Sequence, residues 1–418
     1  MTSEKRQSSL AFVEFVAIMS MMMALTALSI DAMLPALPQI SSELGAANPN
    51  DRQLVISLIF LGQGVGQLFF GPLSDKTGRK PALYAGYALF IVGSLVSVFS
   101  ASFAIMLLGR LLQGIGISAP RAISLALVRD RFEGRRMARV MSFVMTVFIL
   151  VPAIAPTIGH GILSIAGWRA IFGVFVLFAL VTVIWFALRV PETLAPENRI
   201  PFSLRRIVSS IREILKIRSA LGYTLTSGLV YGVFLGYLNS SQQIFQEQYA
   251  LGALFPFYFG VISLSLGAAS FLNARLVMRY GMTKLVRLAL GIIFGLAVVF
   301  LAVSGALAGH PPLWLLMTYL MVSFFSIGIL FGNINALAMQ PLGHLAGTGA
   351  AVVGALSTLI SMLLGTAIGQ SYNGTVLPLV IGIAALTGIA ILVARWADPR
   401  YEARVTKNED LVATDLES

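Results

Sequence analysis

The stretch GPLSDKTGRK, residues 71–80, is a short polar and basic interruption between two apolar blocks, 53–72 and 82–101. Each block approaches the roughly 20 residues that an α-helix needs to cross the hydrocarbon core of a bilayer. Gly78 suits a tight reversal between two such helices, because glycine adopts backbone conformations that are closed to other residues. The stretch therefore predicts two membrane-spanning helices joined by a short loop.

The same alternation of apolar blocks and polar interruptions continues along all 418 residues, of which 57% are hydrophobic and 11% charged. Charged residues make up about 25% of a typical soluble domain, so water alone cannot be the solvent of this chain. The blocks are also too long for the ~10-residue alternating strands of a membrane β-barrel. We predict an all-α membrane protein with spans at 11–39, 53–72, 82–101, 103–126, 138–162, 168–188, 219–244, 255–277, 285–307, 313–336, 346–370 and 375–395.

Basic residues fix the predicted orientation, because Lys and Arg are retained on the cytoplasmic side of a membrane. An even number of spans with the N-terminus inside leaves only Arg52 and Arg169 as basic residues outside. We therefore expect a multi-pass protein of a bacterial inner membrane with both termini in the cytoplasm. The net charge of +11 then comes from basic residues at the cytoplasmic ends of the helices, so we expect no nucleic-acid partner. The chain has no Cys, so neither a disulfide nor a thiolate site is expected.

The chain divides at residues 190–218, which carry three prolines followed by an amphipathic basic stretch at 203–216. Such a stretch is expected to lie along the membrane surface. The predicted parts are an N-terminal six-helix bundle, a cytoplasmic linker, a C-terminal six-helix bundle and a cytoplasmic tail, at 1–189, 190–218, 219–396 and 397–418.

The two halves show a degenerate repeat. LSDKTG, residues 73–78, has an echo in LVMRYG, residues 276–281. Two related halves are typical of transporters that rock around a midplane site and expose it to each side of the membrane in turn.

The polar stretch 71–80 resembles the signature of the major facilitator superfamily between its second and third helices, with matches at Gly71, Asp75, Gly78, Arg79 and Lys80. The resemblance implies a fold of two pseudo-symmetric six-helix bundles. It also implies that Asp75 and Arg79 form a gate latch that joins the two halves at the cytoplasmic side. The second copy carries Met278 in place of Asp75, so we expect its latch to be weaker or absent.

The fourth predicted span contains GRLLQGIG, residues 109–116, which is similar to the arginine-bearing motif of proton-coupled members of this superfamily. At 3.6 residues per turn, Arg110, Gln113 and Arg121 share nearly one helix face. A guanidinium inside a bilayer is costly unless it faces water or a partner, which makes Arg110 a candidate functional residue. Carbonyl groups of neighbouring helices could satisfy Arg110 instead, and Arg121 could lie near the cytoplasmic mouth.

Asp31 in the first span is the predicted partner of Arg110, because the two lie ~15 Å and ~12 Å below their outer helix ends at 1.5 Å per residue. Desolvation favours the neutral form of a buried carboxyl group, and a nearby cation favours its charged form. We therefore predict that Asp31 carries a proton and that Arg110 tunes it. Glu14, near the cytoplasmic end of the same helix, is either a relay carboxylate or an acid solvated by water.

The first span narrows the resemblance. SIDAMLPALP, residues 29–38, resembles the first-helix motif of the bicyclomycin and chloramphenicol resistance branch of drug:proton antiporters, and APRA, residues 119–122, resembles its fourth helix. The resemblance implies export of drug-like molecules in exchange for protons, with the proton gradient as energy source and no cofactor. VPAIAPTIGHG, residues 151–161, departs from the family's fifth-helix antiporter motif, because it keeps the prolines and two glycines but lacks the first glycines. This departure weakens the expectation about the direction of transport.

A pliable cavity wall is expected from methionines of the first span and from polar groups of the seventh and tenth spans. The candidates for substrate contact are Asp31, Met23, Gln113, Arg121, Tyr231, Tyr237, Asn239, Asn333 and Asn335. Polar residues also join membrane helices to one another, so packing remains the alternative for each of them. A mainly apolar cavity with one acid suits lipophilic neutral or cationic compounds, such as chloramphenicol-type drugs.

Other functional classes fit the sequence less well. The sequence has no metalloprotease, serine-hydrolase or Walker-type motif, so we expect neither an enzyme nor a metal site. The main alternative is a proton-coupled transporter of an endogenous metabolite on the same fold, since fold alone does not separate it from drug export. A receptor that binds its ligand without moving it is a more distant alternative. We expect a monomer whose partners are drugs, protons and the lipid bilayer.

Overall fold

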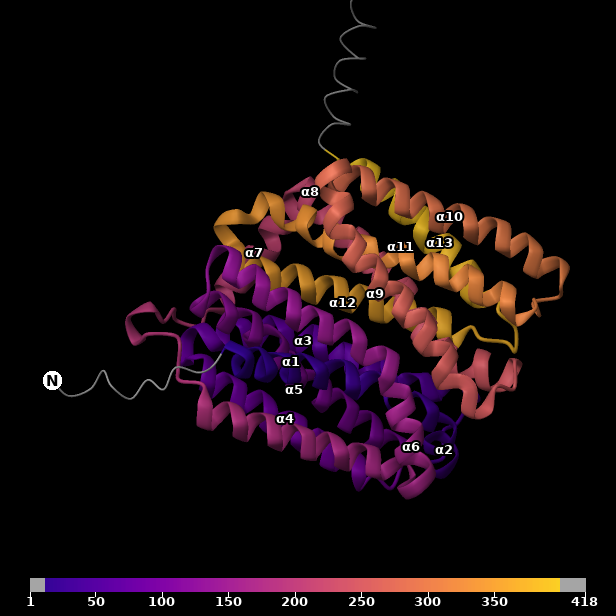
Figure 1. Ribbon diagram of the computed structural model, residues 1–418, viewed down its shortest axis with the longest axis horizontal. Coiled ribbons are helices and arrows are strands. Elements are labelled where there is room, and N and C mark those ends of the chain that lie inside the picture. Colours follow the sequence, from indigo (N-terminus) through magenta and orange to yellow (C-terminus); the bar gives the residue numbers. More distant parts are fainter. Residues whose placement is uncertain (1–11, 399–418) are drawn as a thin grey trace, which may run out of the picture.

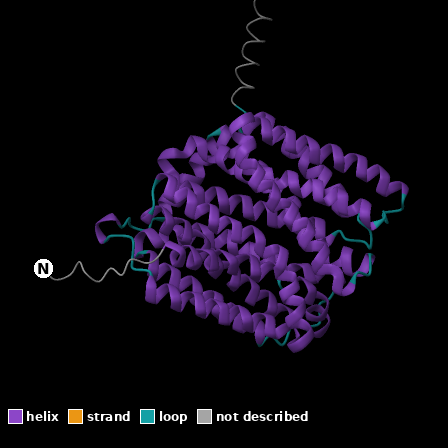
Figure 2. Ribbon diagram, viewed as in Figure 1, coloured by secondary structure: helices purple, strands orange, loops and turns teal. Residues whose placement is uncertain are grey.

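The computed structural model describes residues 12–398, and these residues form helices joined by loops, with no strand among them (Figure 2). Within this range, 11 helices are long and apolar enough to cross a membrane. One of them, α6 (Gly134–Arg189), has 56 residues, far more than a bilayer requires. Its backbone breaks at Gly167, where φ is 75°, so α6 comprises two spans. The predicted all-α membrane fold of twelve spans is thereby confirmed.

The first half of the chain also contains α1 (Phe12–Asp31), α2 (Leu37–Glu43), α3 (Leu54–Thr77), α4 (Arg79–Val98) and α5 (Phe103–Arg131). The predicted first span, 11–39, is not one continuous helix. It ends as an α-helix at Asp31 and resumes after a 3-10 turn, Leu34–Ala36. Pro35 has no backbone N–H to donate to the preceding turn, which accounts for the break.

The linker contains α7 (Leu204–Lys216), which is formed by the amphipathic basic stretch noted in the sequence. Its apolar side buries Ile207 and Ile214. The second half contains α8 (Arg218–Gln242), α9 (Phe255–Tyr280), α10 (Met282–Ala306), α11 (Leu313–Met339), α12 (Ala346–Gln370) and α13 (Leu377–Ala397). A π-helical turn, Gln243–Gln248, extends α8.

The helices form two neighbouring bundles, one from each half of the chain (Figure 1). The bundles meet where α3 packs against α12 and α6 packs against α9. Glycines allow this close approach: a Cβ atom on Gly64 would lie 2.7 Å from the Leu359 side chain, and one on Gly260 would lie 2.7 Å from the Ala153 carbonyl. Small residues at helix interfaces are the usual means of packing helices within a membrane.

The repeat seen in the sequence has the same backbone geometry in both halves. Gly78 follows α3 with φ 104° and ψ 162°, and Gly281 follows α9 with φ 76° and ψ 156°. Both conformations favour glycine, which explains why this residue recurs. The first eleven residues, and those after Asp398 with almost all of the predicted tail at 397–418, lie outside the described residues.

Candidate functional site

Asp31 is the last residue of α1 and is 4% exposed. No hydrogen bond or ion pair reaches its carboxyl group from any residue between 12 and 398. Its surroundings include the end of α1, the break that follows, α6 and, from the second half, Tyr237 of α8, which interacts electrostatically with Asp31. A Cβ atom on Gly159 of α6 would lie 1.6 Å from the carbonyl oxygen of Ala32, so the two backbones are in direct contact. The retained glycine of the fifth-span motif thus packs beside the acid.

Arg110 of α5 is fully buried, and three groups accept hydrogen bonds from its guanidinium. Its Nε donates to the Val55 carbonyl (2.8 Å), Nη1 donates to Gln113 Oε1 (2.7 Å) and Nη2 donates to the Ser29 carbonyl (3.0 Å). Gln113 in turn donates to Ser94 Oγ (2.7 Å). The guanidinium is therefore satisfied by backbone carbonyls of two other helices, α1 and α3, and by the Gln113 side chain of its own helix.

The predicted ion pair between Asp31 and Arg110 is wrong for this conformation. The physical reason lies in the end of α1: the last carbonyl groups of an α-helix have no partner within the helix, and Arg110 binds one of them. A cation is also favourable at the negative end of a helix dipole. Arg110 thus satisfies the helix that carries Asp31 rather than the carboxyl group itself.

Glu14, the other predicted proton-coupling residue, lies near the start of α1. Arg189 donates to both of its oxygens, at 2.5 and 2.8 Å, and the Trp185 indole donates to Oε1 at 3.1 Å. Both partners lie near the end of α6, where the Arg189 side chain is 43% exposed. The structure places Glu14 in a solvent-facing ion pair on the first bundle, away from Asp31.

The predicted substrate-contact residues differ in their burial and in their contacts. Met23 is buried in α1, and Arg121 is half-buried in α5. Tyr231 stacks on Phe331 with the ring centroids 4.2 Å apart, and Tyr237 stacks on Phe259 at 5.7 Å. The Tyr237 hydroxyl is buried without a hydrogen-bond partner.

The three asparagines among these candidates differ in their contacts. Asn239 joins the two halves, because it donates to Ser57 Oγ at 3.2 Å as well as to the Gly365 carbonyl at 3.1 Å. Asn333 donates to Asn273 Oδ1 at 2.7 Å, which joins α11 to α9. Asn335 is half-buried near the end of α11. The contacts of Asn239 and Asn333 are those of helix packing, the alternative that the sequence left open.

The predicted gate latch is an ordered cluster around Arg79, the first residue of α4. Arg79 Nη1 donates to Asp75 Oδ1 at 2.5 Å and to Ser74 Oγ at 2.9 Å, and its Nε donates to Asp130 Oδ2 at 2.8 Å. Asp130 comes from the end of α5, 51 residues along the chain. These bonds unite α3, α4 and α5, all in the first bundle. Gly71, another member of the predicted latch, faces the other half: a Cβ atom on it would lie 3.7 Å from that of Ala351.

The linker is tied to the same cluster through Glu192, a residue that the sequence did not single out. Its carboxylate accepts from the backbone N–H groups of Arg79 and Lys80, both at 2.9 Å, at the start of α4. Burial alone would raise the pKa of Glu192, but the N–H groups of Lys80, Leu194, Arg79 and Thr193 hold it below its usual value. Lys80 Nζ donates to the carbonyls of Ala187 and Val190.

In the second half, Met278 holds the place of Asp75 and is 87% exposed. A thioether cannot replace the carboxylate that accepts from Arg79. A weaker or absent latch in this copy stays a prediction.

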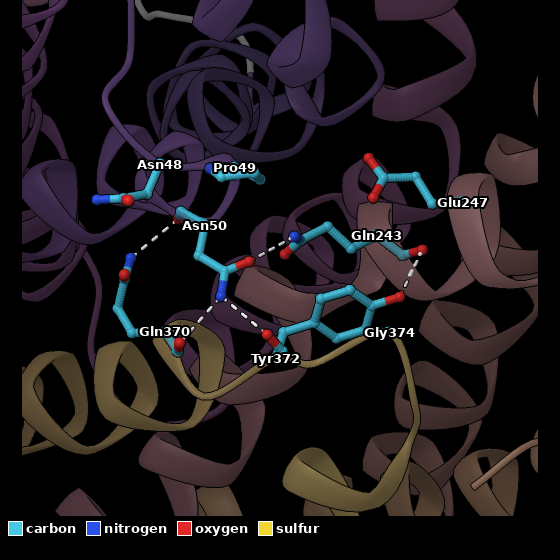
Figure 3. A pocket seen from close by; sticks show the side chains of 8 residues that line it. All are labelled: Asn48, Pro49, Asn50, Gln243, Glu247, Gln370, Tyr372 and Gly374. Atoms are coloured by element: carbon cyan, nitrogen blue, oxygen red, sulfur yellow. Dashed lines mark hydrogen bonds between the residues drawn. The ribbon is translucent and has the colours of Figure 1, made fainter.

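A second polar cluster, also missed in the sequence, joins the halves on the opposite face, predicted to be outside. Its members are Asn50, Gln243, Gln370 and Tyr372, which border a cavity of about 490 Å³ (Figure 3). They are uncharged and lie up to 322 residues apart, so no local motif marks them. Their only signal in the sequence is the gathering of amide side chains at predicted outer helix ends.

Comparison with known proteins adds independent information. The model of the Major Facilitator Superfamily matches residues 11–366. The uncharacterized MFS-type transporter YdgK of Bacillus subtilis is 32% identical over 87% of this chain and 89% of its own length. The bicyclomycin resistance protein homolog of Haemophilus influenzae is 28% identical over 93% of this chain and 96% of its own length. The chloramphenicol resistance protein of Pseudomonas aeruginosa is 27% identical over 81% of this chain and 82% of its own length.

Solved structures show the same fold. The crystal structure of the peptide transporter POT in complex with sulfate superposes with a TM-score of 0.73 at 11% identity, covering 92% of this chain and 93% of that one. The human organic anion transporter MFSD10 superposes with a TM-score of 0.70 at 17% identity, covering 93% and 100%.

Proposed function

This chain belongs to the major facilitator superfamily, and from that premise we propose that it exports lipophilic neutral or cationic drugs in exchange for protons. Transport proceeds by alternating access across the bacterial inner membrane. The proposal is supported by relatives named for bicyclomycin and chloramphenicol resistance, which match most of the chain. The resemblance to that branch, first inferred from residues 29–38, is confirmed by these matches.

One observation carries the proton coupling: Asp31 is a buried carboxyl group in a membrane-spanning segment, and no described residue pairs with it. An isolated carboxylate at such a place is costly. Binding of a proton or of a cationic drug removes that cost, and the two therefore compete for one group. If Asp31 is exposed to each side of the membrane in turn, this competition exchanges a drug molecule for a proton across the membrane.

Arg110 acts in this scheme as a positioning residue. Its bond to the Ser29 carbonyl fixes the end of α1, and its bond to the Val55 carbonyl fixes that end against α3. Gly159 packs on the residue that follows the acid, so α6 borders the same helix end. A displacement of α5 or α6 during the transport cycle would change the surroundings of Asp31, which is what coupling requires.

The cluster around Arg79 serves as the inner gate latch in this proposal. The bonds that Arg79 donates to Ser74, Asp75 and Asp130 hold the ends of α3, α4 and α5 as one unit. A rigid inner edge of the first bundle is needed if this bundle is to rock against the second as a body.

The experiment that tests the proposal measures efflux of a drug panel, including chloramphenicol, from membrane vesicles with an imposed pH gradient. The native chain should move at least one drug, and Asp31→Asn should abolish gradient-driven transport. Glu197→Gln is the matched control, since it neutralises an exposed carboxyl group of the linker. Transport that survives in Asp31→Asn would remove Asp31 from the scheme, and no movement of any drug would favour the metabolite transporter.

A further inference from the structure

The polar cluster on the outer face joins the halves by a set of mutual hydrogen bonds. We call it the outer clasp and define it as Asn50, Gln243, Gln370 and Tyr372. Asn50 Nδ2 donates to the carbonyls of Gln370 and Tyr372, both at 2.9 Å, and Gln370 Nε2 donates back to the Asn50 carbonyl at 2.9 Å (Figure 3). Gln243 Nε2 donates to Asn50 Oδ1 at 2.7 Å. One residue of the first half thus binds three of the second.

An ion pair flanks the outer clasp. Arg52 Nη1 lies 2.5 Å from Glu247 Oε1, and Arg52 is almost fully buried while Glu247 is partly exposed. Gln53 also donates to the side chain of Gln243. The segment before α3 is therefore attached to the end of α8 at two further points.

A second layer of bonds lies one to two helical turns deeper. Ser57 Oγ accepts from Thr366 Oγ1 at 2.7 Å and from Asn239 Nδ2 at 3.2 Å. Ser57 belongs to α3, whereas the other two belong to α12 and α8. The contact between the halves is thus polar from the outer face inward as far as Ser57.

The cavity of about 490 Å³ bordered by the clasp could in principle hold a ligand. However, the amide groups of Asn50, Gln243 and Gln370 donate to one another or to backbone carbonyls across the cavity. A binding site keeps its polar groups free for the ligand. Groups that satisfy one another across the two halves are instead suited to holding these halves together.

Gln243 is also the first residue of the π-helical turn Gln243–Gln248. Its carbonyl accepts from the Tyr372 hydroxyl at 3.3 Å, so both its side chain and its backbone take part in the clasp. Turns of this kind are rare and occur mostly at functional sites, because their backbone hydrogen bonding differs from that of the flanking α-helix.

From these contacts we propose that the outer clasp is the outer gate of the transporter, closed in this conformation, and that Gln243 is its central residue. Opening breaks the bonds of Asn50 to the second half and parts the segment before α3 from α8 and α12. The inference rests on alternating access and is independent of which drug or ion is carried.

Cysteine labelling tests the gate, since the chain has no native Cys. Thr366→Cys places a single thiol beneath the clasp. In right-side-out vesicles, Gln243→Ala should raise its rate of reaction with a membrane-impermeant maleimide by about tenfold or more, as expected when a closed state loses most of its population. The matched control is Gln246→Ala in the same turn, because Gln246 bonds to Gln242 within the second half. Equal rates in the two variants would overturn the proposal.

A distance measurement covers the case in which Thr366→Cys itself disturbs the second layer. Spin labels on Ala47→Cys and Asn373→Cys would flank the cavity from the two halves, at exposed positions. Gln243→Ala should add or enlarge a population with a longer distance between the labels, and Gln246→Ala should not. A single unchanged distance in Gln243→Ala would show that the clasp is a fixed contact. Neither readout needs a drug or a proton gradient, so failure here is distinct from failure of the proposed export.

Discussion

The Arg110 guanidinium donates a hydrogen bond of 3.0 Å to the backbone carbonyl of Ser29, two residues before Asp31. Arg110 therefore holds the helix end that carries the acid and does not neutralise the acid. The carboxyl oxygens of Asp31 stay available to a proton or to a cationic substrate. Arg110 thus positions the acid, whereas Asp31 itself exchanges the proton for the substrate. The two roles can be tested separately.

Arg110→Lys tests the positioning role. Lysine keeps the charge but cannot donate from a planar group to three separate acceptors. We expect the free energy of unfolding to fall by about 1–3 kcal/mol for each acceptor left unpaired, measured as a lower thermal unfolding midpoint in detergent. Arg121→Lys, a half-buried position of the same helix, is the control and should leave the midpoint nearly unchanged. Equal midpoints for native chain and Arg110→Lys would contradict the role of these bonds.

Gly159→Ala tests the contact between α6 and the residue after Asp31. The added Cβ would lie 1.6 Å from the Ala32 carbonyl oxygen, so one of two backbones must move. Overpacking of this kind costs about 1–3 kcal/mol, and we expect both a lower unfolding midpoint and weaker proton-coupled transport.

Gly161→Ala is the control for this prediction, because nothing lies within 4 Å of the added Cβ in the same helix. Alanine in a helix interior is favoured over glycine by about 0.5–1 kcal/mol, so this variant should be as stable as the native chain or more so. If Gly159→Ala and Gly161→Ala had the same unfolding midpoint and the same transport rate, the close approach of α6 to Ala32 would contribute to neither stability nor transport.

The comparison of Asp31 with Arg110 shows what could be predicted from the sequence. Both were recognised as charges inside a membrane, and the motif at 71–80 led to the correct fold. The two do not pair in this conformation, because Arg110 donates to other groups, among them a carbonyl group left without a helical partner where α1 ends ahead of Pro35. Side-chain types do not reveal backbone acceptors created by a helix break.

The gate latch and the outer clasp contain further contacts that could not be predicted from the sequence, here between residues far apart in the chain. Asp75 and Arg79 lie four residues apart in the chain, so a local motif contains both. Glu192 reaches Arg79 from 113 residues away. The clasp joins neutral amides from three separate segments, and a search for buried charges passes over them. Contacts of this kind depend on how the two bundles meet, which a single sequence does not specify.

The latch itself is tested by Arg79→Gln. This change leaves the carboxylates of Asp75 and Asp130 without their cation, and a half-buried charge that loses its partner is destabilising. We expect transport to fall by about tenfold or more, the equivalent of 1.4 kcal/mol, measured as initial efflux rates in vesicles. Lys76→Gln removes an exposed positive charge from the last turn of α3 and should have little effect. Comparable losses in both variants would point to net charge rather than to the latch.

Glu192 gives a pH-dependent prediction. Its pKa is lowered in the folded protein, so its contribution to stability is present above the usual value of 4.5 and is lost as the pH falls through the lowered value. Glu192→Gln should reduce the free energy of unfolding at pH 7 by about 1 kcal/mol, typical of a lost helix cap. The difference between the unfolding midpoints of the two proteins should shrink as the pH is lowered below 4.5. A difference that is the same at all pH values would exclude the charged form as the stabilising one.

The most direct test of proton exchange at Asp31 is proton flux driven by a drug gradient in liposomes that contain the purified protein and a pH-sensitive dye. With a lipophilic cationic drug on one side only and no imposed pH gradient, the native chain should move protons against the flow of drug. Asp31→Asn should abolish this flux, while Glu197→Gln should retain it. Drug-driven proton flux that persists in Asp31→Asn would contradict the account.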